Sequence, residues 1–182
     1  MNRSERINLL LEKSKSEILV IDGAMGTCLQ NLNLTAEDFG GEELDGCNEN
    51  LVITRPDVIE DIHYKYLQAG ADIIETNTFG GTPVVLAEYD LQDQYKEINS
   101  IATQLAVKAR DRFEAENPGE RRFVAGSMGP TTKAISVTGG ITFEELIENF
   151  YEQAKYLYQG GADYFLLETS QDTRNIKAGL IA

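Results

Sequence analysis

The sequence predicts an α/β fold made of the first four βα units of a (βα)8 TIM-type barrel, with parallel strands inside and helices outside. Three observations lead to this fold class. Short apolar runs alternate with amphipathic helical stretches four times along the 182 residues. The first and second units resemble the third and fourth. No glycine-rich turn of the dinucleotide- or nucleotide-binding type follows the first strand.

Each predicted strand is a short run rich in β-branched or aromatic residues, which is typical of a buried strand. The runs lie at 17–21, 71–76, 123–126 and 164–167. The predicted helices carry apolar residues at three- and four-residue spacing. They lie at 5–14, from Pro56 to Gly70, near 83–89, at 94–115, from Thr142 to Gly160 and from Thr173 onward. The stretch 28–55 is expected to be a long polar loop.

The internal repeat favours a closed barrel, in which every strand has an equivalent environment. The first and third strands end in similar segments, 23–26 (GAMG) and 126–129 (GSMG). The second and fourth strands both end in Glu-Thr. A whole barrel takes about 250 residues, so we expect residues 1–182 to be the N-terminal half of a barrel domain. A paired half-barrel dimer and a small open sheet are the alternatives.

Composition narrows the function classes. A net charge of −14 repels phosphate backbones and anionic lipids, so neither nucleic acid nor a membrane is an expected partner. No apolar run approaches the roughly 18 residues of a membrane span, and no signal peptide is evident, so we expect a cytoplasmic protein. Cys28 and Cys47 form neither a disulfide framework nor a metal motif. The single histidine, His63, lies in a predicted helix and is expected to pack rather than catalyse.

Polar residues gather after every predicted strand, where the active face of a barrel lies. Asp22 and Glu168 are suited to an ammonium group, and the glycine-rich backbone nearby is suited to a carboxylate, so the sequence indicates an amino-acid pocket. Each residue also has a structural interpretation: Asp22 a turn, Glu75 an interior pair, Asp172 a helix cap, and Met25 packing. We find no nucleophile–base pair, and therefore predict no catalytic residue and no metal ligand in this chain.

Four segments together resemble the homocysteine S-methyltransferase family, in particular the N-terminal homocysteine-binding domain of cobalamin-dependent methionine synthase. They are 21–27 (IDGAMGT), 70–79 (GADIIETNTF), 124–131 (VAGSMGPT) and 167–172 (LETSQD). The segments 45–49 (DGCNE) and 137–143 (VTGGITF) favour methionine synthase over other homocysteine methyltransferases.

The resemblance implies methyl transfer from methylcobalamin, itself methylated by methyltetrahydrofolate, to zinc-bound homocysteine, giving methionine. In that family three cysteines of the second barrel half bind zinc, so this chain is expected to bind neither zinc nor cobalamin and to be inactive alone. Its expected partners are homocysteine, the remaining barrel half and the cobalamin and folate modules. The residues that the resemblance places around the amino-acid end of homocysteine are Asp22, Gly23, Ala24, Thr76, Asn77, Ser127 and Glu168.

Three alternatives remain open from the sequence. One is a betaine- or methylmethionine-dependent homocysteine methyltransferase with the same barrel. Another is a non-catalytic half-barrel that binds amino acids or assembles with a second chain. A third is an aldolase-type barrel, for which Lys133 is the one lysine near the pocket, although its neighbours are not apolar enough to lower its pKa.

Overall fold

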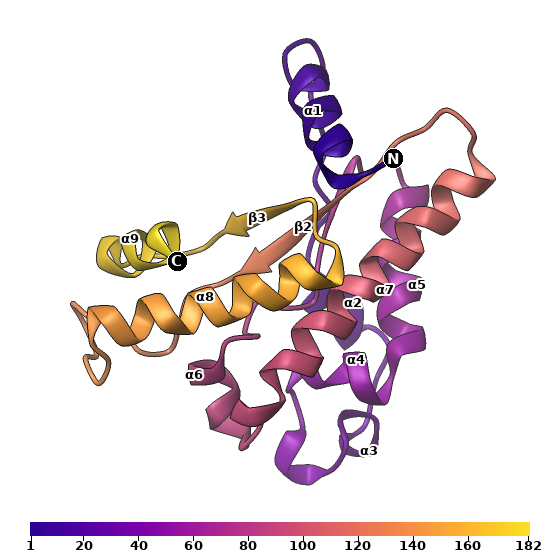
Figure 1. The fold of residues 1–182 in the computed structure, drawn as a ribbon. Coiled ribbons are helices and arrows are strands. Elements are labelled where there is room, and N and C mark those ends of the chain that lie inside the picture. Colours follow the sequence, from indigo (N-terminus) through magenta and orange to yellow (C-terminus); the bar gives the residue numbers. More distant parts are fainter.

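The sheet is parallel, and its strands follow the order of the chain. The computed structural model describes residues 1–182. Strands β1 (Ile73–Glu75), β2 (Phe123–Met128) and β3 (Tyr164–Leu167) are neighbours in that order (Figure 1). Glu75 pairs with Ala125, and Ala125 pairs with Tyr164. Parallel neighbours joined by helical crossovers are the repeating unit of a barrel wall.

The first predicted strand, at 17–21, is reduced to a single bridge in the structure. Only Ile21 makes a bridge, to Ile73, although the amide of Asp22 still donates to the Ile73 carbonyl at 2.9 Å. Expecting a buried strand here was wrong, because Ile18 is 95% exposed and Val20 53% exposed. The segment pairs on one side alone, and no other element covers it, so regular strand geometry does not extend beyond the bridge.

Helices follow each strand as predicted. The long ones are α1 (Arg3–Lys13), α5 (Pro56–Gln68), α7 (Tyr95–Glu116), α8 (Phe143–Gly160) and α9 (Thr173–Ile181). The Thr142–Glu145 capping box begins α8, and Asp172 caps α9 by accepting the Arg174 amide. The expected polar loop at 28–55 was wrong in part, because short turns of helix fold it: α2 (Met25–Gln30), α3 (Ala36–Phe39), η1 (Glu42–Leu44), η2 (Asn48–Asn50) and α4 (Leu51–Thr54). The predicted piece near 83–89 is α6 (Pro83–Leu86) with η3 (Ala87–Tyr89), and η4 (Gln92–Gln94) leads into α7.

The two faces of the sheet bury different residues. Ile74 and Val124 point outward and pack with α5 and α7, while Met128 packs with α8. Alternate positions point inward, where Ile73 and Phe123 form a separate cluster. The long helices therefore cover one face only, and the other face is the interior of an incomplete barrel (Figure 1).

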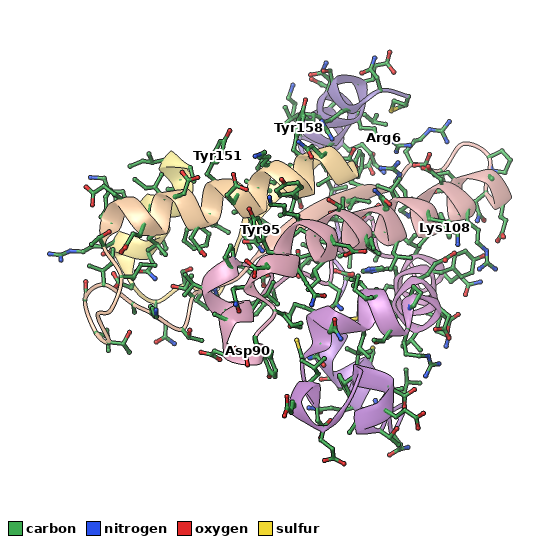
Figure 2. All side chains as sticks on the ribbon, turned by 60° about the horizontal axis from the view of Figure 1, so that its bottom comes forward. Arg6, Asp90, Tyr95, Lys108, Tyr151 and Tyr158 are labelled. Carbon is green, nitrogen blue, oxygen red and sulfur yellow. The ribbon has the colours of Figure 1, made fainter.

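Helix α1 closes the end of this interior at the start of the strands. Leu9 and Leu10 pack against the inward cluster of the strands. Arg6 fixes the helix by donating to Glu114 of α7 at 2.7 Å, and it lies where α1 meets the rest of the chain (Figure 2). Arg3 donates to the Ala162 carbonyl at 2.8 Å. One end of the interior is thus filled with apolar side chains, and the other end is left for polar ones. None of the helices combines the length and apolarity needed to cross a lipid bilayer.

Candidate functional site

A cavity of about 440 Å³ lies at the carboxyl ends of the strands. All seven residues predicted from the sequence line it, although they come from four separate segments of the chain. The full lining is Asp22, Gly23, Ala24, Met25, Gly26, Asn48, Glu49, Glu75, Thr76, Asn77, Phe79, Ser127 and Glu168. The structure therefore brings these seven residues together, whereas their role in binding homocysteine stays a prediction.

Local strand geometry places the acids. Glu75 follows Ile73 by two positions on β1, so it shares the inward face and continues from apolar packing into the cavity. Glu168 directly follows β3, beyond the inward Leu166. Thr169, the next residue, has a left-handed φ of 56°, which is uncommon for a β-branched side chain and turns the chain away at this point.

The cavity is strongly acidic. Four carboxyl groups line it, from Asp22, Glu49, Glu75 and Glu168, and no lysine, arginine or histidine does. Carboxylates that lack a cationic partner are costly to bury, so this arrangement favours a positively charged ligand group.

Hydrogen bonds fix the acids in place. Ser127 Oγ donates to Glu168 Oε1 at 2.5 Å. Both carboxylate oxygens of Asp22 accept from the Glu75 amide, at 3.1 and 3.2 Å. The Thr76 hydroxyl accepts from the Ser127 amide at 3.0 Å and contacts the Thr78 hydroxyl at 2.6 Å. The side chains around the cavity are therefore held before any ligand arrives.

Burial and mutual repulsion change the titration of two of the acids. Burial raises the pKa of Asp22 to about 7, and the nearby charges of Glu75 and Glu168 add to the shift. Burial also raises the pKa of Glu75 to about 7, and the nearby charge of Glu168 adds to the shift. Such shifts are typical of functional sites, where acids are held without a compensating cation.

Three residues that line the cavity have unused backbone donors. The amides of Gly23, Ala24 and Asn77 donate to no other group of the chain. Since backbone N–H groups without a partner are suited to bind an oxyanion, the cavity can take a carboxylate as well as a cation. Cationic and anionic recognition in one cavity is what a zwitterionic amino acid requires.

The rim contains residues that the sequence-based site did not include. Glu49 Oε1 accepts from the Gly80 amide at 2.7 Å, and burial raises the Glu49 pKa. Asn77 Nδ2 donates to the Asn48 carbonyl at 2.8 Å. These contacts join the 45–50 segment to the loop after β1. The sequence signal for this contact is the acidic residue of the 45–49 segment, a segment that also contributes to the family resemblance.

Other conspicuous residues lie outside the cavity. Asp172 accepts from the Ser136 amide at 2.7 Å and caps α9, so its structural interpretation holds. His63 is fully buried in α5, as packing predicts, and Lys133 does not line the cavity. The aldolase-type alternative therefore has no lysine at the site.

The chain does not offer a zinc site. No group of three or more histidine, cysteine or acidic side chains is arranged to hold a metal ion. Cys47 is fully buried in the apolar core, and the Cys28 sulfur lies 3.4 Å from the Tyr66 hydroxyl. A protein zinc site needs three or four converging ligands. These residues do not fit that requirement.

A parallel αβ wall with polar residues at the carboxyl ends of its strands defines part of a TIM-type barrel. The chain belongs to the homocysteine S-methyltransferase family, whose model matches residues 19–182. Among solved structures it is similar to the homocysteine methyltransferase MmuM from Escherichia coli. The metallated form aligns with a TM-score of 0.78 and 28% identity, over 95% of this chain and 60% of that one. The oxidized form aligns with a TM-score of 0.75 and 27% identity, over 98% and 60%.

The chain thus spans about 60% of the length of MmuM. Membership of the family and the partial barrel agree with the sequence-based expectations.

Proposed function

We propose that the acidic cavity binds the amino-acid end of homocysteine, and that residues 1–182 form the N-terminal half of the homocysteine-binding barrel domain of a methionine synthase. The observation that carries this proposal is that carboxylates without a cationic partner and backbone amides without an acceptor lie around one cavity of about 440 Å³. Family membership supports homocysteine as the substrate.

In this proposal the acids of the cavity bind the substrate ammonium group, and the backbone amides bind its carboxylate. Glu168 accepts hydrogen bonds from the substrate ammonium group, and Asp22 supplies a second carboxylate. Ser127 orients Glu168 through its 2.5 Å hydrogen bond, and Thr76 fixes Ser127 through the backbone. The amides of Gly23, Ala24 and Asn77 bind the substrate carboxylate.

Activation of the sulfur is not assigned to any residue of this chain. We propose that zinc and its cysteine ligands belong to the remaining barrel half, and that cobalamin and folate bind to further modules of the same enzyme. In this division of labour, the residues described here hold and orient the amino acid, and another part of the enzyme supplies the metal and the methyl donor.

A second candidate is a homocysteine methyltransferase with a small-molecule donor such as betaine or methylmethionine. The similarity to MmuM is equally compatible with it. A methyl-transfer assay on the natural protein that carries this chain separates the two. Methionine formed from methylcobalamin, and not from betaine or methylmethionine, is the result we expect. Transfer from one of the small donors alone would reject the methionine synthase assignment.

Binding by the chain itself is tested by calorimetry with homocysteine and two analogues. Homocysteine and methionine should bind, since both present the same ammonium and carboxylate groups. An analogue without the amino group, 4-sulfanylbutanoate, should bind at least tenfold more weakly, because it leaves the acids without a cation. Equal affinity for all three would reject the amino-acid site.

A further inference from the structure

The cavity holds more carboxyl groups than one substrate ammonium group can neutralise. The charges of Glu75 and Glu168 raise the pKa of Asp22, the charge of Glu168 raises the pKa of Glu75, and no basic side chain lines the cavity. An amino acid brings a single positive charge together with a carboxylate of its own. Some of the negative charge in the empty cavity must therefore be balanced in another way, and protons are the simplest means.

Glu75 is the acid best placed to carry a proton. It points inward from β1 into the cavity. Its carboxyl group accepts no hydrogen bond within the chain, whereas the carboxyl groups of Asp22, Glu49 and Glu168 each accept one from a backbone amide or a hydroxyl. Because hydrogen-bond donors stabilise the charged form of an acid, the carboxyl group without a donor is the one that most readily keeps a proton.

The groups around Glu75 favour its protonated form. The titratable groups that face Glu75 are Asp22 after the first strand segment, Glu168 after β3 and Tyr164 on β3. Glu49 lines the same cavity from the η2 segment. All of these groups are acidic, so none stabilises an ionised Glu75. Burial together with the Glu168 charge raises the Glu75 pKa to about 7.

We propose that the empty cavity stores a proton on Glu75 and releases it to solvent when an amino-acid ammonium group binds. This inference rests on the proposed function, since it concerns the same site. In the exchange the O–H bond of Glu75 breaks and its proton passes to the buffer. The ammonium group keeps its three protons and donates hydrogen bonds to the carboxylates, so the charge in the cavity is balanced by the substrate instead of the proton.

The consequence is a substrate affinity that rises with pH over a narrow range. Release of one proton from a group with a pKa of about 7 predicts about tenfold tighter binding at pH 8 than at pH 6, with little further gain above pH 8. About one proton should leave for each amino acid bound at pH 6, and few at pH 8.

L-methionine is the appropriate probe, because it has no thiol proton to confuse the count. Calorimetric titration of the chain at pH 6, 7 and 8, in two buffers with different ionisation enthalpies, gives the affinity and the number of protons released. The Glu75→Gln variant keeps the size and polarity of the side chain without a stored proton. Between pH 6 and pH 8 its affinity for methionine should rise about tenfold less than that of the unmodified chain, and it should release about one proton fewer at pH 6. The exposed Glu88→Gln is the control that removes a charge outside the cavity.

Infrared difference spectroscopy of the unmodified chain gives a second measurement that needs no variant. Methionine binding should remove the C=O band of a protonated carboxyl group, and ¹³C-labelling of glutamate should shift that band. Methionine binding without proton release and without loss of the band would overturn proton storage and leave the amino-acid site intact. Absence of methionine and homocysteine binding at every pH would instead contradict the proposed function, and this inference with it.

Discussion

Ser127 and Glu168 are 41 residues apart in the sequence, and their side chains are joined by a 2.5 Å hydrogen bond. Ser127 lies on the inward face of β2, and Glu168 directly follows β3, the adjacent strand. This contact fixes the acid that we assign to the substrate ammonium group, and it forms only when the two strands pair in register.

The Ser127→Ala variant tests that contact. Without the hydroxyl donor, Glu168 loses a hydrogen bond to a charged group, which is worth about 1.5–3 kcal/mol. We expect about tenfold weaker binding of methionine or homocysteine by calorimetry, and an unfolding temperature lower by a few degrees, because the bond is present before a ligand binds. Ser127→Thr retains a hydroxyl and should recover part of the affinity. Unchanged affinity in Ser127→Ala would show that the hydrogen bond does not orient the acid.

Replacing Glu75 should stabilise the fold above neutral pH. Its folded-state pKa of about 7 lies above the usual value of 4.5, so the contribution of Glu75 to stability is most favourable below pH 4.5 and is lost as pH rises from there through 7. Since the side chain is half-exposed to solvent, we expect Glu75→Gln to gain about 1–2 kcal/mol at pH 8 and less at pH 5. Urea denaturation at the two pH values measures this. A variant less stable than the unmodified chain at pH 8 would contradict the repulsion described here.

Because the His63 ring is buried, we expect the fold to lose stability in acid. The ring is fully buried in α5, and neither nitrogen has a hydrogen-bond partner. Burial lowers its pKa from 6.5 to about 4, so its neutral form is stable above pH 6.5 and the fold loses stability as pH falls from there towards 4. We expect a cost of about 2 kcal/mol between pH 7 and pH 5.

The His63→Leu variant isolates this cost, because leucine suits the apolar surroundings and does not titrate. Its free energy of unfolding should fall less than that of the unmodified chain between pH 7 and pH 5, in urea titrations. Identical pH dependence in both proteins would show that His63 gains a proton without opening the core.

Gly129 is predicted to be essential for the rim of the cavity. A Cβ at this position would lie 2.6 Å from the Phe79 carbonyl oxygen and 2.8 Å from its ring, and the Gly129 amide donates to that carbonyl at 3.1 Å. We expect Gly129→Ala to destabilise the fold by about 1–3 kcal/mol through overpacking and to weaken amino-acid binding. Gly26→Ala, whose Cβ would meet only ordinary contact, is the matched control for stability.

The sequence predicted the parts of the site that follow strands. The carboxyl ends of parallel strands meet at one edge, so strand order alone predicts that Asp22, Thr76, Ser127 and Glu168 converge. Helix capping by Asp172 followed from local residue preference in the same way. These predictions succeeded because they depend on strand order and local geometry alone.

The remaining features depend on contacts between distant segments. Glu49 reaches the cavity through the Gly80 amide, 31 residues away, and no periodic pattern in the 28–55 stretch indicates that contact. Ile18 is exposed because no other element packs against it, and an apolar run in the sequence does not show whether another element will cover it. The packing of Leu10 of α1 against the strand interior is a third example.

The most direct test of the central claim is an NMR titration of the ¹⁵N-labelled chain with L-homocysteine, repeated on Glu168→Gln. The account predicts saturable shifts of the Gly23, Ala24 and Asn77 amides, and about hundredfold weaker binding in the variant because a charge-assisted hydrogen bond is lost. Equal affinity in the two proteins, or shifts confined to residues outside the cavity, would contradict it.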